Sequence, residues 1–336
     1  MSTTIRALRD AELDEHADLV FRSYREGRDL PPGSMLTQPD WWRRSIGREP
    51  GYTPEQTRVM ALDGRLVASV TCFRRPSYVA GEVLPLVCIG SVCTDPDYRR
   101  RGLVRQVLAA TANWLESQGV IWSFLFGLES IYGGSGWRNL ASWSTRIDLR
   151  LRGDRGVDLR ERPADPRQDL PALSTLHEGF GGSLTGPLRR SREFWQRRVL
   201  AVPGPWAVAP TYQVLEQGGQ GVGYYAGHDG QVNEVAWAPG QGEAVLAFLL
   251  RRWPGRPVSL PFFTGALAES LRALSVIPSQ GECQGHPGGV TLTETYRGLW
   301  RFHCDPQGLV PAVRDTESLL RFLRDHDYTY WPADRA

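Results

Sequence analysis

The segment from Ser91 to Gly136 constrains the fold of this chain most, because its parts follow one another in a set order. An apolar strand ends at Cys93, and the basic loop from Arg99 to Gly102 follows it. Apolar residues then recur at three- and four-residue spacing up to Gly119, which is typical of an amphipathic helix that ends at a glycine. A second strand and a glycine-rich turn come next. This order predicts a helix whose apolar face packs on a sheet.

The basic loop has the features of a site for a diphosphate. The N–H groups and the dipole at the start of a helix attract anions, and arginine side chains add charge-assisted hydrogen bonds. Successive backbone N–H groups in a turn form a concave anion site in the same way. The residues that we expect to contact the phosphates are Arg99, Arg100, Arg101, Gly102, Leu103 and Val104.

The stretch from Val92 to Val104 resembles the acetyl-CoA loop of the GNAT N-acetyltransferase superfamily, whose pattern is Arg/Gln-x-x-Gly-x-Gly/Ala. Arg99 and Gly102 match this pattern, and Val104 departs from it. Further along the chain, Ser130 to Trp137 resembles the tyrosine turn of the superfamily. Two motifs in the right order are more specific than one. The resemblance implies that acetyl-CoA is the cosubstrate.

The resemblance also implies how the cosubstrate lies. We expect the backbone of Val92, Cys93 and Thr94 to run beside the pantetheine arm, which would pair with it like an added strand. Backbone N–H groups where the sheet opens after Val92 would polarise the thioester carbonyl. Cys93 has the alternating position of a core side chain, and we favour this interpretation over a covalent acetyl-cysteine.

Within the superfamily, Arg99–Arg105 and Ile131–Gly133 look most like the Eis branch, which consists of multidomain bacterial acetyltransferases that can modify aminoglycosides. Thr185–Arg190 similarly resembles the opening of the second domain in that branch, and Gly298–Phe302 resembles the strand that closes it. Eis proteins continue into a sterol-carrier-like domain, and only a short segment follows Asp305 here. We expect that third domain to be missing or reduced to a stub.

The chain divides into two domains in this interpretation. The length of 336 residues fits two domains of roughly 150 residues each, and the tract from Ile147 to Asp169 has the composition of a joint. We therefore expect an α+β fold with a mixed sheet, formed by an acetyl-CoA-binding GNAT domain at 1–155 and a degenerate GNAT-like domain at 156–336. In the second domain, Ala238–Glu243 stands where the phosphate loop would be, and Glu243 would repel a diphosphate.

Composition argues against several kinds of partner. The apolar content is 41%, and no apolar run approaches the roughly 18 residues that a membrane-spanning helix needs. A net charge of +2 gives no general field for nucleic acid, and neither the six histidines nor the five cysteines show the spacing of metal ligands. The amino terminus lacks the pattern of a secretory signal. We expect a cytoplasmic protein with reduced cysteines, no metal, and no nucleic-acid or membrane partner.

Tyr132 is the candidate general acid. Acetyl transfer from a thioester to an amine needs a proton for the departing thiolate, and a phenol with an ordinary pKa of about 10 is protonated at neutral pH. The resemblance implies the same role for this tyrosine, and the alternative is a tyrosine that only packs in the turn. No general base stands out. Glu129 and Glu82 are the nearest carboxylates in sequence, and an ordered water chain is an equal alternative.

Together these features predict an N-acetyltransferase that moves acetyl from acetyl-CoA to a primary amine of a peptide or of a small, aminoglycoside-like molecule. The alternative is a non-catalytic acyl-CoA-binding or assembly protein, and a homo-oligomer stays open. In the GNAT pattern, Trp41 and Trp42 would lie near the acceptor cleft. Tyr328, Tyr330 and Trp331 near the carboxyl end would either line an acceptor pocket or anchor the tail, and we favour anchoring.

Overall fold

The structure is a computed structural model that describes residues 2–26, 35–148, 158–201, 211–274, 278–280, 289–326, 328–329 and 331. The strands of its first half are β1 (Thr3–Ala7), β2 (Thr57–Leu62), β3 (Arg65–Arg74), β6 (Val87–Thr94), β7 (Trp122–Leu125) and β8 (Arg138–Asp148). The helices of this half are α1 (Leu13–Arg25), α2 (Trp41–Gly47), α3 (Leu103–Ser117) and α4 (Glu129–Tyr132). A separate hairpin is formed by β4 (Ser77–Val79) and β5 (Glu82–Leu84).

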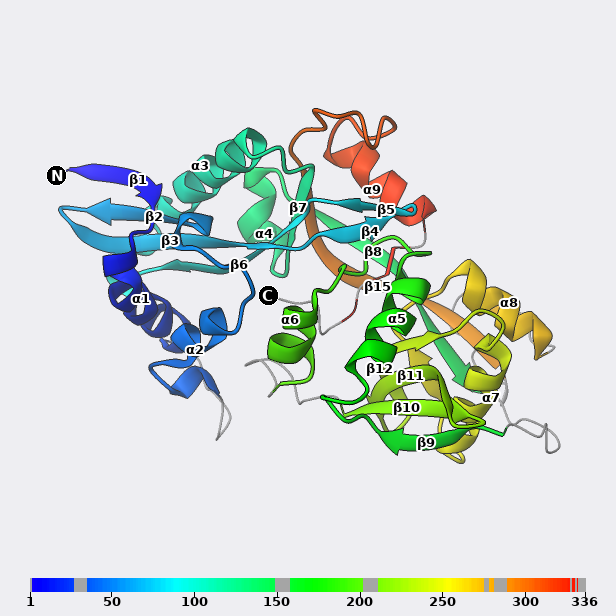
Figure 1. Cartoon of the computed structure of the whole chain (residues 1–336). Coiled ribbons are helices and arrows are strands. Elements are labelled where there is room, and N and C mark those ends of the chain that lie inside the picture. The colour runs from blue at the N-terminus through cyan, green and yellow to red at the C-terminus, as the bar shows by residue number, and fades with distance from the viewer. Residues whose placement is uncertain are drawn as a thin grey trace.

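Helices cover both faces of the first half of the sheet (Figure 1). α1, with α2 beside it, packs on one face of β3 and β6, and α3 packs on the other face. Each helix layer buries its own apolar cluster against the strands. This is the helix-on-sheet arrangement that the order of elements around α3 predicts, and the expected α+β fold is confirmed.

Local sequence explains several of these elements. The dipeptide Asp63-Gly64 predicts a hairpin, because both residues readily adopt positive φ in a two-residue turn. Both have positive φ, and the pairing of β2 with β3 confirms the hairpin. The apolar stretch from Val83 to Cys93, which we expect to be one strand, is instead divided between β5 and β6. The division falls at Pro85, which has no N–H to give to a ladder.

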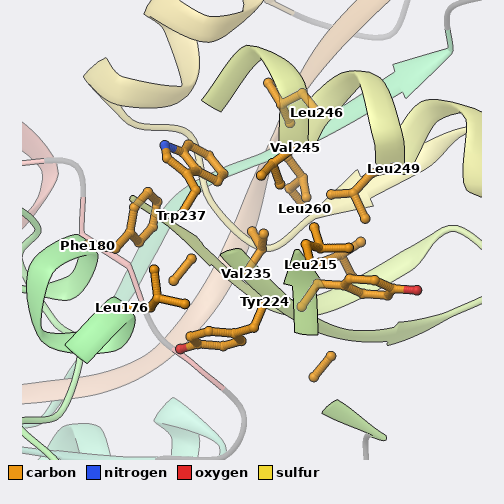
Figure 2. Packing of buried hydrophobic residues seen from close by; sticks show 14 of the residues in the cluster. Leu176, Phe180, Leu215, Tyr224, Val235, Trp237, Val245, Leu246, Leu249 and Leu260 are labelled. Carbon is orange, nitrogen blue, oxygen red and sulfur yellow. The ribbon is translucent and has the colours of Figure 1, made fainter. Parts of the chain in front are cut away.

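The second half begins with β9 (Arg160–Pro163), α5 (Leu170–Gly181), α6 (Arg192–Phe194) and the π-helix η6 (Trp195–Val199). An antiparallel meander follows, with β10 (Tyr212–Gln217), β11 (Gln220–His228) and β12 (Gln231–Trp237). The remaining elements are α7 (Gly242–Arg252), β13 (Val258–Leu260), α8 (Gly265–Ala273), β14 (Pro278–Gln280) and α9 (Thr316–Asp325). Figure 2 shows the core of this half, where Trp237 packs edge to face on Phe180 with ring centres 4.5 Å apart.

One strand from the carboxyl-terminal part of the chain ties the two halves together. β15 (Gly289–Phe302) pairs antiparallel with β8, and its last residues, Leu299–Phe302, also pair with β7. The sequence resemblance places this segment at the end of the second domain, whereas the structure inserts it between two strands of the first half. The resulting sheet runs in the order β1-β2-β3-β6-β7-β15-β8-β13-β12-β11-β10-β9. Both halves therefore share one continuous sheet.

The close approach of β15 to β7 depends on a glycine. Gly298 lies at a bulge in β15 and has a φ of +110°, which side chains rarely allow. A Cβ at this position would also come within 2.7 Å of the Leu125 carbonyl oxygen of β7. Only glycine fits both conditions, so the bulge admits the end of β15 into the first half of the sheet.

Two aromatic residues near the carboxyl end are buried in the two cores. Tyr328 is 2% exposed and packs edge to face on Trp300, and Trp331 is 1% exposed and packs on Phe262. Both residues anchor this segment, as we expected. Tyr330 and the boundary near residue 156 lie outside the described residues, so the division into 1–155 and 156–336 stays a prediction. Residues 206–210, which the sequence pattern predicts to be a strand, lie outside them as well. None of the described helices combines the length and apolar character needed to cross a bilayer.

Candidate active site

A cleft opens where two neighbouring strands of the sheet separate. β6 and β7 run parallel and pair from Val87 with Ser123 to Ile89 with Leu125. β6 continues to Thr94 along β3, so the other edge of its last residues faces a space of about 850 Å³. The end of α1, the loop before α3 and the turn at α4 form the other walls. The predicted site residues on these walls are Val92, Cys93, Thr94, Arg99, Arg100, Gly102, Leu103, Val104 and Tyr132.

A β-bulge turns the backbone of β6 toward the cleft. The register between β3 and β6 shifts there, and Ser91 has a φ of +47°. Beyond the bulge the Asp95 N–H donates to the Val67 carbonyl at 2.8 Å. Because main-chain groups alternate between the two edges of a strand, those of Val92 and Thr94 face the open edge. An extended ligand in the cleft would meet this edge as a neighbouring strand does.

Asp95 fixes the segment that leads into the basic loop. It is fully buried, and its Oδ2 accepts hydrogen bonds from Arg22 and Arg65, both at 2.8 Å, while its Oδ1 accepts one from the Asp97 N–H at 3.1 Å. Burial alone would raise the pKa of Asp95, but Arg22, the Asp97 amide and Arg65 outweigh it and lower the pKa below the ordinary value. Asp95 therefore joins α1, β3 and the loop through charge.

Replacing Asp95 with asparagine should lower the free energy of unfolding by about 1.5–3 kcal/mol at neutral pH. The hydrogen bonds from Arg22 and Arg65 to a neutral amide are weaker than those to the carboxylate. Since the folded-state pKa is lowered, the contribution of the carboxylate is present above its unfolded-state pKa of about 4 and is lost as pH falls through the folded-state value. Urea unfolding at a series of pH values should show the native protein and the variant converging in acid. A difference that stays constant with pH would contradict this role.

The arginines of the loop differ in their surroundings. Arg99 and Arg100 line the cleft, and Arg99 Nη2 donates to the Ser23 carbonyl at 2.8 Å. Arg101 is not among the residues of the cleft wall, and its guanidinium lies 5.0 Å from the centre of the Tyr98 ring. Arg99 and Arg100 therefore form part of the cleft wall, whereas Arg101 is held against the Tyr98 ring.

The backbone of the loop presents the start of α3 to the cleft. Arg100 has a φ of +61° and Gly102 a φ of +71°, so two left-handed residues lead into the helix. The Gln106 N–H donates to the Gly102 carbonyl at 3.4 Å as the first bond within the helix, and the earlier amides of Leu103 and Val104 open on the cleft. An arginine in this conformation costs on the order of 1–2 kcal/mol. Such strain is concentrated at functional sites.

Tyr132 lies at the end of α4, on the wall of the cleft opposite the loop. Burial, together with the nearby Tyr296 and Cys93, raises the pKa of Tyr132 to about 12. The phenol therefore keeps its proton throughout the physiological pH range. Its ring packs directly on Gly127, where a Cβ would overlap the ring atoms.

Tyr296, which is distant in sequence, holds the segment around Gly127 that packs against the Tyr132 ring. The Tyr296 hydroxyl of β15 donates to the Gly127 carbonyl at 2.9 Å and accepts from the Gly127 N–H at 3.2 Å. Because Gly127 contacts the Tyr132 ring, Tyr296 is a positioning residue for Tyr132. Sequence reasoning missed Tyr296, since the insertion of β15 beside β7 is a long-range pairing that no local pattern indicates.

Cys93 is a buried thiol and not an exposed nucleophile. Burial raises the pKa of Cys93 to about 11, and its Sγ lies 3.1 Å from Ser69 Oγ. That hydroxyl in turn lies 2.8 Å from Nε2 of the buried His16. A thiol with so high a pKa is protonated at neutral pH and reacts slowly. These contacts agree with the expectation that Cys93 is a core side chain.

Neither carboxylate considered as a general base lines the cleft. Glu129, at the start of α4, accepts a hydrogen bond from Asn139 Nδ2, and Glu82 is exposed on the separate β4–β5 hairpin. A third carboxylate, Glu49, lines a pocket that adjoins the cleft. Within the described residues, no group of three or more His, Cys, Asp or Glu side chains could hold a metal ion.

The adjoining pocket has a volume of about 60 Å³ and meets the cleft at Tyr24, Gly90 and Ser91, next to the bulge of β6. Both tryptophans expected near an acceptor line it. Trp42 Nε1 donates to Ser91 Oγ at 2.8 Å, and Trp41 Nε1 has no hydrogen-bond partner among the described residues. Its other walls are Ser45, Ile46, Glu49, Phe73 and Arg198.

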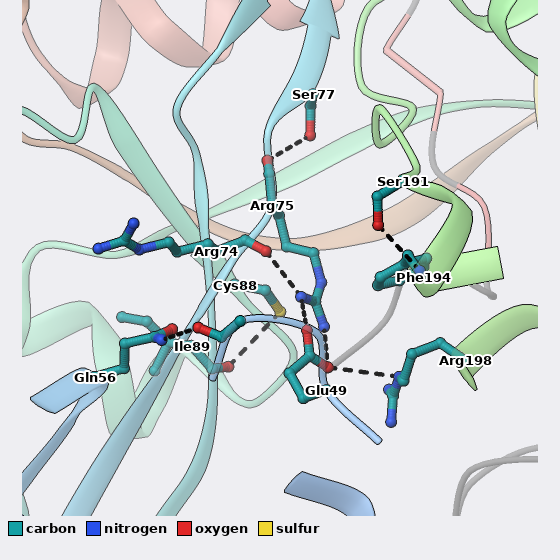
Figure 3. Close-up of polar contacts among 11 residues, drawn as sticks. Glu49, Gln56, Arg74, Arg75, Ser77, Cys88, Ile89, Ser191, Phe194 and Arg198 are labelled. Carbon is teal, nitrogen blue, oxygen red and sulfur yellow. Dashed lines mark hydrogen bonds and ion pairs between the residues drawn. The ribbon is translucent and has the colours of Figure 1, made fainter. Parts of the chain in front are cut away.

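Figure 3 shows how the carboxylate of this pocket is neutralised. Glu49 is 6% exposed and forms a two-pronged ion pair with Arg75, in which Arg75 Nη2 donates to Glu49 Oε2 at 3.0 Å. Arg198 of η6 approaches Oε2 at 3.5 Å. The second half of the chain thus supplies part of this pocket wall. A carboxylate held by two arginines offers no surplus negative charge to a ligand.

In the described part of the second half, the start of the corresponding helix is covered by another helix. Gly242 at the beginning of α7 is buried, and a Cβ there would overlap Ser270 of α8 and lie 3.0 Å from Trp237 Nε1. α8 therefore packs over the place that corresponds to the phosphate loop. Glu243 in the first turn adds negative charge. Both observations support the prediction that this half is a degenerate copy that does not bind the cosubstrate.

Comparison with known proteins agrees with this geometry. Residues 4–140 match the family model described as "Acetyltransferase (GNAT) domain". The amino-terminal part of the chain is therefore similar to a GNAT acetyltransferase domain over these residues. The match contains every residue that lines the cleft, from Ser23 to Tyr132. No curated protein matches the whole sequence at a significant level.

Solved structures share the fold over most of the chain, beyond the residues that match the family model. A probable N-acyltransferase from Enterococcus faecalis V583 superposes with a TM-score of 0.65 at 14% identity, over 92% of this chain and 75% of that one. A GCN5-related N-acetyltransferase from Anabaena variabilis gives 0.62 at 13% identity, over 90% and 73%. Eis1 from Mycobacterium abscessus gives 0.54 at 17% identity, over 77% and 65%. At these identities the likeness establishes the fold alone.

Proposed function

We propose that this protein is an N-acetyltransferase that uses acetyl-CoA to acetylate a primary amine of a small molecule or a peptide. The observation that carries the proposal is the meeting of three features in one cleft: the open edge of β6, the first turn of α3, and Tyr132 with its raised pKa. They provide a strand edge for the pantetheine arm, an anion site for the diphosphate and a proton donor.

Acetyl-CoA would supply the acetyl group as a thioester, whose carbonyl carbon forms a bond to the amine nitrogen while the bond to sulfur breaks. Backbone N–H groups of β6 where the sheet opens would stabilise the negative charge that develops on the carbonyl oxygen, while those of Val92 and Thr94 pair with the pantetheine arm. The Tyr132 O–H, protonated because its pKa is about 12, donates its proton to the sulfur. Loss of the amine proton is assigned to water, because Glu49 is held by arginines and Glu129 lies outside the cleft.

The pocket beside the bulge favours a compact apolar amine as the acceptor. Tyr24, Trp41, Trp42 and Phe73 provide aromatic walls, and the volume of about 60 Å³ holds a group of only a few heavy atoms, since one water needs about 10–15 Å³. The carboxylate of Glu49 is already paired. We therefore propose an acceptor with a small aromatic or branched aliphatic substituent in preference to an aminoglycoside-like polycation.

Membership in the Eis-like branch is also a proposal. It is supported by the match of Arg99–Arg105 and Ile131–Gly133 to that branch and by the shared fold with Eis1. The aromatic pocket and the compensated Glu49 indicate that the acceptor differs from a polycation even if the branch is the same. Fold and acceptor class are therefore separate questions, and each needs its own test.

A panel of amines tests the acceptor class. Release of the CoA thiol from acetyl-CoA should be at least roughly tenfold faster in kcat/KM with phenylethylamine or a peptide with an N-terminal leucine than with spermidine or an aminoglycoside. The chain contains no lysine, so acetylation of its own side-chain amines does not compete in the assay. A preference for the polycations would contradict the acceptor class. Thiol release with none of the amines, together with tight acetyl-CoA binding, would favour a non-catalytic acyl-CoA-binding protein.

A further inference from the structure

A second groove continues from the tyrosine turn. Ser130–Tyr132 line the cleft, whereas Gly134–Gly136 line an open groove of about 710 Å³. The end of β15 and the segment that leads into α9 form its other walls. Arg105 of α3 lines both the cleft and the groove, so the two spaces meet at this side chain.

The groove carries surplus positive charge from three separate segments. Its lining residues include Arg105 on α3, Arg301 on β15 and Arg314 just before α9. The one acid among them is Asp315, whose Oδ1 accepts from the Ser318 N–H at 2.7 Å and so caps α9. Three arginines from distant parts of the sequence line one groove, and guanidinium groups favour a dianion such as a phosphate.

The glycine turn brings two of these arginines close to the backbone. A Cβ at Gly134 would lie 3.9 Å from Arg105 Nη2, and a Cβ at Gly136 would lie 3.5 Å from the Arg301 side chain. Arg301 Nη1 also donates to the Ser135 carbonyl at 2.6 Å. The turn that begins with Tyr132 is therefore enclosed by Arg105 and Arg301.

Two polar atoms of the groove residues have no hydrogen-bond partner among the described residues. They are Ser135 Oγ and Nδ1 of His303, a residue that is 7% exposed. His303 uses its other ring nitrogen, Nε2, at 2.8 Å from Ser123 Oγ. Buried polar atoms are rarely left without a partner in native proteins. Both residues line the groove beside the three arginines, so its wall is polar as well as positively charged.

We propose that this groove binds the 3′-phosphate of coenzyme A. The inference rests on the proposed function, which puts the diphosphate at Gly102–Val104. Coenzyme A carries a second anionic group, the 3′-phosphate, on the ribose beyond the diphosphate. From Gly102 to Ala109 the axis of α3 advances about 10 Å, and Arg105 lies between them. The nucleotide part of coenzyme A would thus pass Arg105 and place its 3′-phosphate between Arg301 and Arg314.

Titration calorimetry with coenzyme A and 3′-dephospho-coenzyme A tests the assignment. The native protein should bind coenzyme A at least roughly tenfold more tightly, because one or more hydrogen bonds between charged groups are at stake. Arg314→Gln should remove this preference and leave the affinity for the dephosphorylated form unchanged. Arg324→Gln is the matched control, since Arg324 is exposed on the last turn of α9 and is not among the groove residues. It should leave both affinities unchanged.

Each other outcome decides the question. Equal affinity of the native protein for the two ligands would overturn this inference and leave the proposed function standing. Binding of neither ligand would overturn both. An equal loss of both affinities in Arg314→Gln would show that the arginine acts on the fold or on the diphosphate, and it would also overturn the assignment of the 3′-phosphate.

Discussion

Replacing Tyr132 with phenylalanine is expected to lower kcat by about 10²–10³-fold while the Kd of acetyl-CoA stays within roughly twofold, because only the proton donor is removed and the ring still packs on Gly127. Steady-state release of the CoA thiol gives kcat, and calorimetry gives the Kd. The native protein should show no loss of kcat from this group below about pH 10, because the acid is active in its protonated form and its pKa is about 12.

Tyr98→Phe is the matched control for this change. Tyr98 lines the same cleft at its phosphate end, and its ring, which remains in the variant, is the part that contacts Arg65 and Arg101. It should keep a kcat close to that of the native protein. An unchanged kcat in Tyr132→Phe would show that Tyr132 only packs in its turn, and the proton would then have to come from water.

Arg100→Glu should weaken acetyl-CoA binding by about 100-fold, because a cation on the cleft wall becomes an anion beside the diphosphate. Arg101→Glu makes the same change in charge one residue away, but Arg101 lies over the Tyr98 ring outside the cleft wall. We expect the acetyl-CoA affinity of Arg101→Glu to fall by less than roughly tenfold. Calorimetry at several salt concentrations should show that the difference between the two variants shrinks as salt screens the charge.

A second variant separates charge from backbone conformation at this position. Arg100 has a positive φ, so Arg100→Gly keeps the loop conformation and removes backbone strain on the order of 1 kcal/mol. It should be as stable as the native protein or more stable, and still bind acetyl-CoA more weakly. Equal losses of acetyl-CoA affinity in Arg100→Glu and Arg101→Glu would contradict the assignment of the phosphates to the cleft wall at Arg100.

Local patterns in the sequence predict the elements around the cleft well. The amphipathic spacing from residue 103 corresponds to α3, and the turn at Asp63-Gly64 corresponds to the β2–β3 hairpin. The bulge at Ser91 and the left-handed Arg100 are not visible in the sequence. Arginine and serine rarely adopt positive φ, and only the surrounding structure imposes it there. A motif therefore locates the loop but does not reveal which of its arginines faces the ligand.

Long-range pairing accounts for most of what sequence reasoning misses. Tyr296 supports the loop beneath Tyr132 only because β15 crosses from the second half into the sheet beside β7. Arg198, on the π-helix η6, approaches Glu49 in the pocket that adjoins the cleft. Both contacts join residues that are far apart along the chain, and neither residue belongs to a motif. The adjoining pocket and the groove at Arg314 can be recognised only once the fold is known.

A crystal structure of the protein with acetyl-CoA tests the central claim most directly. The proposed mechanism predicts that the pantetheine arm pairs with the N–H groups of Val92 and Thr94 on the open edge of β6. It also predicts the Tyr132 hydroxyl within hydrogen-bond reach of the thioester sulfur, at about 2.6–3.5 Å. Acetyl-CoA bound elsewhere, or bound in the cleft with its sulfur far from Tyr132, would contradict the claim that this cleft carries out acetyl transfer.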